Sequence, residues 1–179
     1  MKKIWLLLIP IVFIVGCMNV MNTPTKRVEE FFAKYQTMDK EVLNELDTTL
    51  ENDENLGKEN KAEYKALVEK QYQNLSYKIK NETVNGNSAV VDVEIEVFDY
   101  AKAITRADKY ILEHEEEFKD KDGNIDNNKF MKYKIRKMKK VTDKVKYTIS
   151  FDLEKDDNIW RLSPISDTDI NKIHGLYNE

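Results

Sequence analysis

Side chains suited to catalysis are few in this sequence, whose 179 residues include one cysteine and two histidines. His114 is the most interesting of them. Residues 101–117 have helical spacing, and on that helix His114 would share the apolar arc with Ile111 and Phe118. A histidine buried there could act as a general base or contact a ligand. The alternative, which we favour, is a core histidine bonded to a backbone carbonyl or a tyrosine. No Ser-His-Asp order or glycine-rich elbow accompanies His114, so we expect no catalytic residues and no enzyme.

An acidic segment, Asp120-Lys-Asp-Gly-Asn-Ile-Asp126, resembles the start of an EF-hand calcium loop. Aligned on Asp120, however, the glycine required at the sixth position is Ile125, and the bidentate glutamate at the twelfth is Met131. We therefore expect a polar turn in which Asp126 caps the next helix. A single cysteine also excludes a Cys-rich zinc site, and we expect no metal and no cofactor.

A helix expected from Asn127 to about Val141 carries much of the basic charge. Its apolar arc contains Lys134, whose ammonium needs a carboxylate on the preceding helix or else reaches out to solvent. We favour the route to solvent. The opposite face gathers five cations, which are Lys129, Lys132, Arg136, Lys139 and Lys140.

This basic face follows an acidic helix end at residues 113–117. The simplest interpretation is two neighbouring, solvated helices of complementary charge. The alternative is that the five cations contact an anionic surface, either membrane lipids or wall polymers. Aromatic residues are not interleaved with these cations, and the whole chain has a net charge of −4, so we expect no nucleic-acid partner.

Three aromatic residues, Tyr77, Tyr147 and Trp160, lie on the apolar faces of expected strands. Together with His114 they are the candidate lining of a pocket for an apolar or amphipathic ligand. The same residues would fill an ordinary core, which is the interpretation we favour.

Hydrophobic periodicity indicates the elements that position these residues. Thr23-Pro24 begins the first helix, and Gly175 ends the last one. Helices are expected near 24–35, 42–46, 59–73, 101–117, 127–141 and 167–174, and strands near 75–80, 89–97, 145–153 and 159–162. The order ααα-ββ-αα-ββ-α predicts an α+β domain, with N-terminal helices packed on a curved antiparallel sheet of about four strands. A helical insert at about 101–141 separates the two hairpins.

The register of both hairpins follows from their side-chain patterns. A three-residue loop over 85–87 keeps the apolar residues of the first hairpin on one face. The expected pairs are Tyr77 with Ile95, Lys78 with Glu94, Ile79 with Val93 and Lys80 with Asp92. In the second hairpin, a turn at Asp156-Asp157 pairs Leu153 with Trp160 and Asp152 with Arg161.

The N-terminal residues indicate where the protein resides. After the basic Met1-Lys2-Lys3, residues 4–15 are almost entirely apolar. As a helix they would span about 18 Å, short of the ~30 Å hydrocarbon core, which favours a secretory signal over a membrane span. Ile14-Val15-Gly16-Cys17 resembles the bacterial lipobox, which implies a diacylglycerol on the Cys17 thiol and cleavage before it. An ordinary secreted protein is the alternative.

This interpretation divides the chain into a lipoprotein signal peptide over 1–16, a lipidated tether over 17–23 and a single α+β domain over 24–179. The mature chain would have 163 residues, with 27 basic and 33 acidic side chains and a net charge of −6. Its expected location is the outer face of the cell membrane.

Three short sequence segments carry a resemblance to a known family: residues 24–32, Ile159-Trp160-Arg161-Leu162 and Lys172-Ile173-His174-Gly175. They resemble a group of Gram-positive bacterial lipoproteins whose domains are similar to the nuclear transport factor 2-like (cystatin-like) fold. The resemblance implies helices packed in the concavity of a bent sheet, from which the long insert departs. The group has no agreed activity, so no catalytic residues carry over.

We therefore predict a non-catalytic, lipid-anchored module that binds a small ligand or an envelope protein, with the membrane contacted through the diacylglycerol on Cys17. One alternative is an isomerase- or dehydratase-like enzyme that uses His114 as its base. The other is an envelope assembly factor that acts through charge.

Overall fold

The computed structural model describes residues 22–53 and 56–178 of the chain. The expected signal peptide, Cys17 and the tether up to residue 21 lie outside the described residues. Within the described ranges, no helix combines the length and apolar content needed to cross a bilayer.

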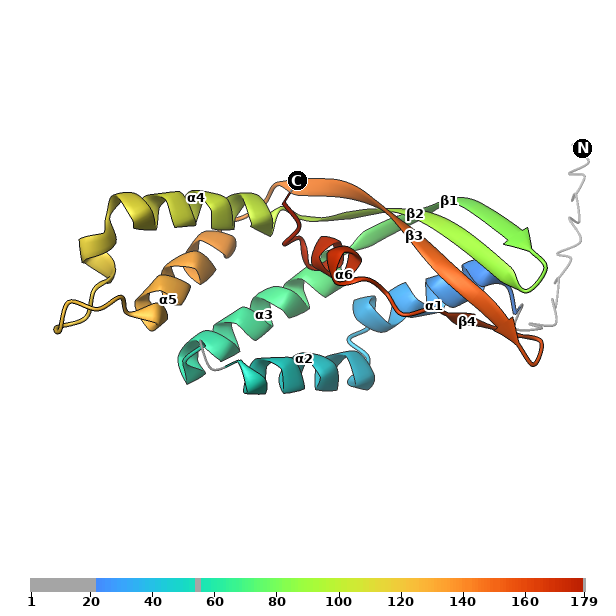
Figure 1. The fold of residues 1–179 in the computed structure, drawn as a ribbon, viewed down its shortest axis with the longest axis horizontal. Helices are drawn as coiled ribbons and strands as arrows, with labels where there is room; N and C mark the ends of the chain where they lie inside the picture. Colours follow the sequence, from blue (N-terminus) through green and yellow to red (C-terminus); the bar gives the residue numbers. More distant parts are fainter. Residues whose placement is uncertain (1–21, 54–55, 179) are drawn as a thin grey trace, which may run out of the picture.

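The order of helices and strands confirms the predicted α+β class (Figure 1). Three helices come first, two hairpins enclose a helical insert, and a short helix follows; the short 3-10 helix η1 is an addition to the predicted order. The helices are α1 (Pro24–Gln36), α2 (Lys40–Asn52), α3 (Lys58–Asn74), α4 (Tyr100–Glu113), η1 (Glu115–Phe118), α5 (Asn127–Met138) and α6 (Asp167–His174). The strands are β1 (Ser76–Asn85), β2 (Ser88–Phe98), β3 (Lys144–Asp156) and β4 (Ile159–Leu162).

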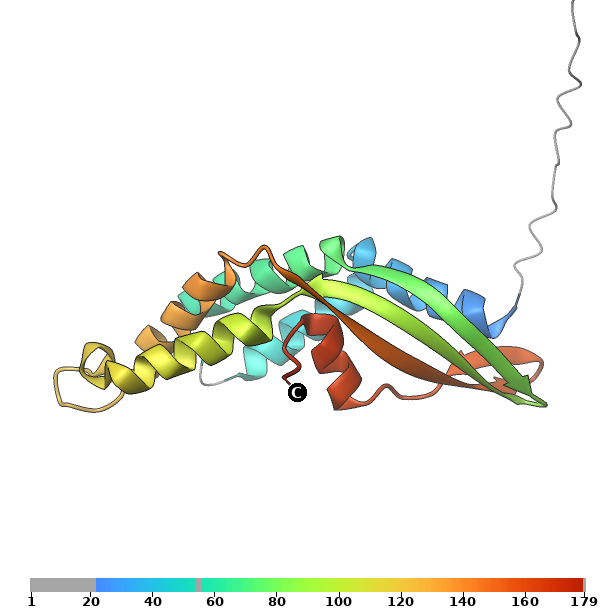
Figure 2. The ribbon, with the colours of Figure 1, turned by 90° about the horizontal axis from the view of Figure 1, so that it is seen from above.

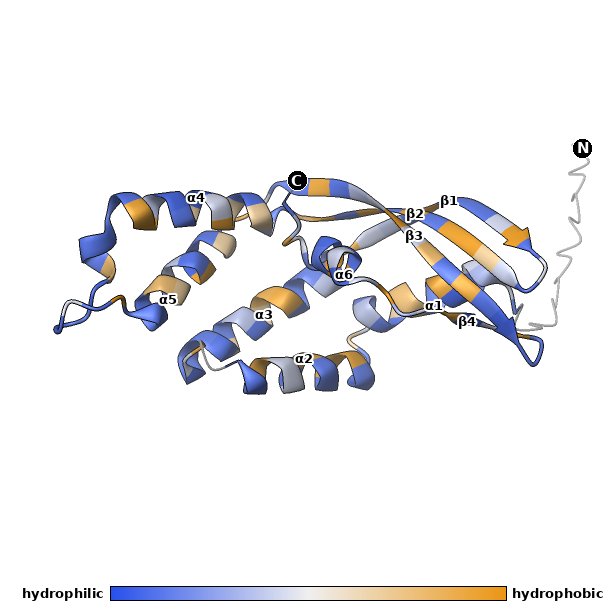
Figure 3. Cartoon of the chain, in the orientation of Figure 1, coloured by the Kyte–Doolittle hydropathy of each residue, from blue (hydrophilic) through white to orange (hydrophobic). Residues whose placement is uncertain are grey.

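The four strands form one antiparallel sheet in the order β1-β2-β3-β4, which bends along its length (Figure 2). Because side chains alternate along a strand, the odd-numbered residues of β2 from Val91 to Val97 point into the core, and each is fully buried. Helix α1 packs on this face, where Phe32 stacks on Tyr77 with ring centroids 4.6 Å apart. The strands accordingly show alternating hydropathy along their length (Figure 3).

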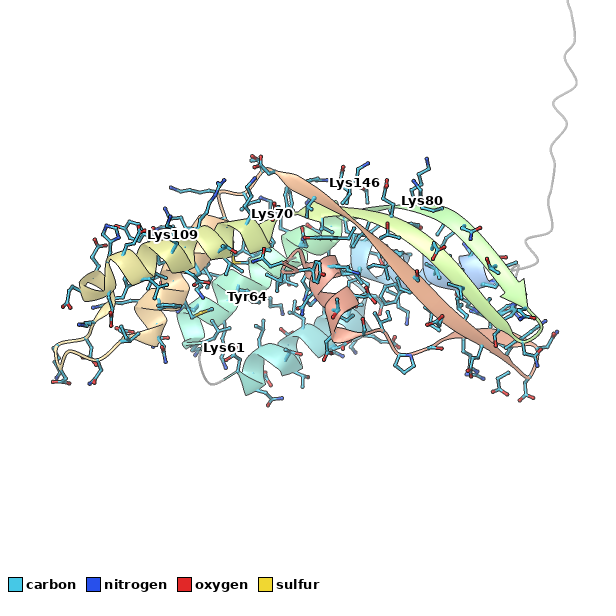
Figure 4. All side chains as sticks on the ribbon, turned by 45° about the horizontal axis from the view of Figure 1, so that its top comes forward. Lys61, Tyr64, Lys70, Lys80, Lys109 and Lys146 are labelled. Carbon is cyan, nitrogen blue, oxygen red and sulfur yellow. The ribbon has the colours of Figure 1, made fainter. Side chains whose placement is uncertain are left out.

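The other face of the sheet is polar. Glu94 on β2 pairs with Lys80 on β1 at 3.5 Å and with Lys146 on β3 at 3.3 Å. Figure 4 shows both lysines projecting from the same side of the sheet. Such exposed pairs add little stability, so the sheet is held mainly by its backbone ladder and by its helix-covered face.

The first hairpin has the predicted register near its open end, but its loop is shorter than predicted and a bulge in β1 makes up the difference. Ile79 pairs with Val93 as expected, as do Tyr77 with Ile95 and Lys78 with Glu94. The expected three-residue loop is wrong: Asn85 pairs with Ser88, which leaves a two-residue turn, and Gly86 within it has φ 61°. A bulge at Lys80 supplies the extra residue, so Asn81, not Lys80, lies opposite Asp92.

The predicted register of the second hairpin is wrong by two residues. Leu153 pairs with Leu162, and Trp160 pairs with Lys155. The turn consists of Asp157 and Asn158, both with positive φ (46° and 64°). Short polar residues tolerate this left-handed backbone, and the resulting two-residue turn matches the twist of the strands.

Several helix ends are fixed by the predicted caps. The Thr23 hydroxyl accepts from the Lys26 N–H at 3.2 Å, and the Ser166 hydroxyl accepts from the Asp169 N–H at 3.1 Å. Gly175 ends α6 with φ 69°, a conformation that favours glycine. These caps account for the agreement between predicted and observed starts of α1 and α6.

The insert forms one end of the molecule and has its own small core (Figure 1). Ala107 and Ile111 of α4 pack with Phe118 and with Tyr133 of α5, separately from the main core. The β3–β4 turn lies at the other end of β3, whose 13 residues span about 43 Å. The insert therefore extends away from the end of the sheet at which Asn22, the first described residue, bonds to the Trp160 N–H at 3.1 Å.

Candidate functional site

His114 is not the buried base that helical periodicity suggested. Helix α4 ends at Glu113, so the arc that contains Ile111 does not continue to His114, which is exposed. Its ring stacks on Tyr110 with centroids 4.0 Å apart, and its Nδ1–H donates to the Tyr110 carbonyl at 2.9 Å. His114 thus closes the end of α4, and it is not among the residues that line the five main hollows of the described domain.

The three aromatic candidates do not form one pocket with His114. Tyr77 and Tyr147 both pair with Ile95 in register, which places a strand between them. Trp160 lies towards the opposite end of β3, is 5% exposed and packs beneath Lys155. Trp160 packs in the core, as favoured. Tyr77 and Tyr147 are both partly buried against the core, and each also lines a separate open hollow.

The acidic loop before α5 forms the predicted turn. Asp120 Oδ1 accepts from the Asp122 and Asn124 N–H groups at 2.8 and 2.9 Å, and Asp126 caps α5 by accepting from the Asn128 and Lys129 N–H groups. Within the described part of the chain, no group of three His, Cys, Asp or Glu side chains is placed to hold a metal ion.

Lys134 finds a carboxylate instead of reaching solvent. Its Nζ lies 2.6 Å from Asp108 Oδ1 on α4, and the lysine side chain is only 18% exposed. The same ammonium sits 4.5 Å above the centre of the Phe130 ring. The less favoured alternative is therefore the one observed: an ion pair that joins the two helices of the insert.

The predicted basic face is divided between two sides of α5. On the side facing α3, Lys132 pairs with Glu59 at 3.1 Å and Lys139 pairs with Glu63 at 2.8 Å. The hydrogen bond from Lys139 lowers the pKa of Glu63. The carboxylates that pair with these lysines therefore come from α3. The sequence had predicted that they would come from the acidic end of α4. A shallow groove on this side is lined by Lys129, Lys132, Arg136, Lys139, Glu63, Glu117, Phe118 and Tyr133.

On the side facing α4, a hollow of about 370 Å³ lies between the two helices and the α5–β3 connection. Tyr110 and Tyr133 line it, with stacked rings whose centroids are 5.0 Å apart. Lys137 Nζ lies 4.9 Å from the centre of the Tyr133 ring. Burial and the adjacent Glu117 carboxylate raise the pKa of Tyr110, whose hydroxyl donates to Glu117 at 3.2 Å. The charged residues of this hollow are Asp99, Lys102, Arg106, Lys137, Lys140 and Asp143.

Lys140 is one of the five cations predicted to form a basic face, but the hollow itself and its other charged residues were not predicted from the sequence. Lys102, Arg106 and Tyr110 recur at every fourth position of α4, so they share one face of that helix. Tyr133 and Lys137 have the same spacing on α5. A search for two facing basic-aromatic stripes, instead of one cluster on a single helix, would have found them.

Comparison with known proteins adds nothing to this geometry, because no family model, no curated protein and no solved structure matches the chain. The resemblance to lipoproteins with a nuclear transport factor 2-like domain therefore stays a prediction. The candidate site is defined by the insert itself: two helices, stacked tyrosines and an unusually basic second helix. Residues 127–140 contain seven basic and no acidic side chains.

Proposed function

We propose that this protein is a lipid-anchored, non-catalytic binding module at the outer face of the cell membrane. The lipobox-like Ile14–Cys17 supports the anchor. The alternative of an enzyme with His114 as its base is weakened because His114 is exposed and lines none of the main hollows of the described domain. The insert is the part of the molecule that makes contact with the ligand or partner.

One observation carries this proposal: the chain enters the domain at the end opposite to the insert. Asn22 bonds to the Trp160 N–H at 3.1 Å and to the Asn158 carbonyl, beside the β3–β4 turn. The residues from Cys17 to Asn22 can extend at most about 18 Å, whereas β3 alone spans about 43 Å. An anchor at Cys17 would hold the β3–β4 turn near the bilayer and leave the insert free to face outward.

The charge of the insert suits this role. The mature chain is acidic overall, yet residues 127–140 are strongly basic, so an anionic partner would be drawn to this end of the molecule. Steering of this kind needs no enclosed pocket, which fits the open hollows on both sides of α5. The partner is therefore expected to be an anionic component of the envelope.

The anchor is tested by expressing the full chain in a Gram-positive host and measuring the mass of its N-terminal peptide. The expected result is a peptide that begins at Cys17 with a diacylglycerol, and a protein that fractionates with membranes. Cys17→Ser should release the protein, whereas His114→Gln should leave it in the membrane fraction. Recovery of unmodified Cys17 in a soluble secreted form would overturn the proposal.

The orientation is tested with a photo-crosslinking residue at either end of the anchored protein. Val84, 51% exposed near the β1–β2 turn, marks the anchored end, and Leu112, 80% exposed on α4, marks the insert. Phospholipid adducts are expected at position 84 and not at position 112. Equal lipid labelling at both positions would show that the insert lies on the bilayer.

A further inference from the structure

Two hollows flank the same two cations of α4. The first, described above, lies between α4 and α5. The second, of about 480 Å³, lies between α4, the start of β3 and the C-terminal residues, and Tyr147 and Tyr177 line it. Lys102 and Arg106 line both hollows, as does Asp99. The two hollows therefore adjoin at these residues, and together they are here called the α4 groove, whose cations are Lys102, Arg106, Lys137, Lys140 and Lys146.

Most of the positive charge in the α4 groove is not neutralised. Arg106, Lys137 and Lys140 form no ion pair with any residue that the structure describes. Lys102 is 4.0 Å from Asp143, a separation at the outer limit of an ion pair, and Lys146 pairs with Glu94. By contrast, Lys132 and Lys139 on the other side of α5 are occupied by α3 carboxylates, which leaves Lys129 and Arg136 as the cations of that side without an ion pair to a described residue. The α4 groove is therefore the side of the insert with more cations available to a ligand.

The nearby carboxylates do not compensate this charge. Asp99 accepts from the Lys102 N–H at 3.0 Å and so serves as the N-cap of α4, and Asp143 lies at the rim in the α5–β3 connection. Five cations line the groove, against Asp99, Asp143 and the Glu94 carboxylate that pairs with Lys146, so the groove keeps a positive field.

The arrangement of these cations indicates the shape of the ligand. Lys137 and Lys140 lie in the first hollow, Lys146 lies in the second, and Arg106 lines both. Charges that converge on one point would suit a single anion, whereas charges distributed along a groove suit a chain with repeated anionic groups. The guanidinium of Arg106 suits phosphate, because its donors match two phosphate oxygens at once, as they also match the two oxygens of a carboxylate.

We propose that the α4 groove binds a linear polyanion built on repeated phosphate groups, which passes over Lys102 and Arg106 from one hollow to the other. The stacked rings of Tyr110 and Tyr133 form the apolar wall of the first hollow against which the chain lies. This inference rests on the proposed function only in treating the insert as the recognition end of the molecule. The groove itself makes no use of the lipid on Cys17.

The test uses the full chain purified in detergent, whatever the state of its N-terminus, and titrates it with long-chain sodium polyphosphate, tripolyphosphate or orthophosphate. Polyphosphate is expected to bind most tightly, tripolyphosphate less so and orthophosphate least, with affinities that fall as salt is added. Because the assay does not depend on lipidation, its failure is separate from a failure of the anchor, which is read from the N-terminal mass.

Variants locate the binding. Arg106→Gln and Lys140→Gln break no ion pair with a described carboxylate, so both variants should fold normally. Each should weaken polyphosphate binding about fivefold. The matched controls are Lys109→Gln, an exposed residue of α4 that lines neither hollow (Figure 4), and Lys132→Gln, on the α3 side of α5. Both controls should retain at least half of the wild-type affinity.

Three outcomes would overturn the proposal. The first is equal loss in the control variants, which would indicate diffuse charge attraction. The second is orthophosphate binding as tight as polyphosphate binding, which would indicate a single-anion site. The third is binding to phosphatidylglycerol vesicles that is lost in Arg106→Gln while polyphosphate binding is kept, which would assign the groove to a lipid surface.

Discussion

The hydroxyl of Tyr72 lies 2.9 Å from Nε2 of His174, and this contact joins α3 to α6. Burial lowers the pKa of His174 to about 4 and raises that of Tyr72 well above its usual value of 10. At neutral pH both side chains are therefore uncharged, and one hydrogen bond joins the tyrosine hydroxyl to the imidazole. The same tyrosine packs edge-to-face on Tyr35 of α1, so the pair lies where three helices meet.

The folded state should become less stable in mild acid because of His174. Its pKa is about 4 in the folded chain but 6.5 when exposed, so between these values the unfolded chain binds more protons. The free energy of unfolding should fall by about 2 kcal/mol between pH 7.5 and 5 on this account. Urea titrations at the two pH values measure it, as the difference between wild type and His174→Gln.

The second histidine of the chain provides the control. His114 is exposed at the end of α4, so His114→Gln should reproduce the pH dependence of the wild type. The free energy of unfolding should fall less in acid for His174→Gln than for the wild type or His114→Gln. Parallel stability profiles for all three proteins would exclude His174 as the source.

The contact between Gln71 and Phe98 supports a prediction about α6. The Gln71 side chain accepts from the Phe98 N–H at 2.9 Å and donates to the Phe98 carbonyl at 3.1 Å. Gly175 packs against the same carbonyl, and a Cβ there would lie 2.0 Å from the oxygen. Gly175→Ala should therefore destabilise the domain by about 3 kcal/mol, through the clash as well as the left-handed backbone.

Gly86→Ala separates these two effects. Gly86 has φ +61°, similar to Gly175, but nothing lies within 4 Å of the position of its Cβ. Its substitution should cost only the backbone term, about 1 kcal/mol. Equal losses for both alanine variants in thermal or urea unfolding would contradict the proposed close contact.

The ion pair between Asp108 and Lys134 should contribute measurable coupling within the insert. The lysine is largely covered, so loss of the carboxylate leaves an ammonium poorly solvated. A double-mutant cycle with Asp108→Ala and Lys134→Ala should give a coupling free energy of about 1 kcal/mol. The exposed pair Lys109–Glu113, at 3.9 Å, should give a value close to zero, and equal values would argue that the partial burial of Lys134 has no effect.

The fold could be predicted where a local signal and the hydrophobic period agree. Thr23-Pro24 and Ser166 start helices as expected, and the alternation of β2 fixed the buried face of the sheet. The predicted hairpin registers were wrong where the backbone departs from regular strand geometry, at a bulge or at a turn with positive φ. The second hairpin is shifted by two residues, which leaves the alternation unchanged. The bulge at Lys80 reverses the alternation only over the mostly polar residues 81–85, so it leaves little mark in hydrophobic periodicity.

The candidate site was only partly predictable for a different reason. The basic residues of α5 are evident in the sequence, but their partners come from α3, which is distant along the chain. Periodicity also assumed that one helix continued to His114, whereas α4 ends at Glu113. Which cations are paired and which are free depends on tertiary contacts that no single-helix pattern contains.

The bulge in β1 allows the register of the first hairpin to be tested by deletion. Because Ile79 pairs with Val93 and Asn81 pairs with Asp92, removal of Lys80 makes the two paired segments continuous. The deletion should therefore keep the fold and change the free energy of unfolding by about 1 kcal/mol or less.

Deletion of Lys78, two residues earlier in the same strand, is the matched control. It would shift Tyr77 by one position and turn its ring away from Phe32, on which it stacks in the wild type. The expected loss is about 3 kcal/mol, since a large aromatic contact leaves the core. Urea unfolding gives both values, and nuclear Overhauser contacts between Tyr77 and Phe32 report the register directly. Those contacts should persist without Lys80 and vanish without Lys78; the reverse pattern would mean that the bulge, and not continuous pairing, holds Tyr77 on the buried face.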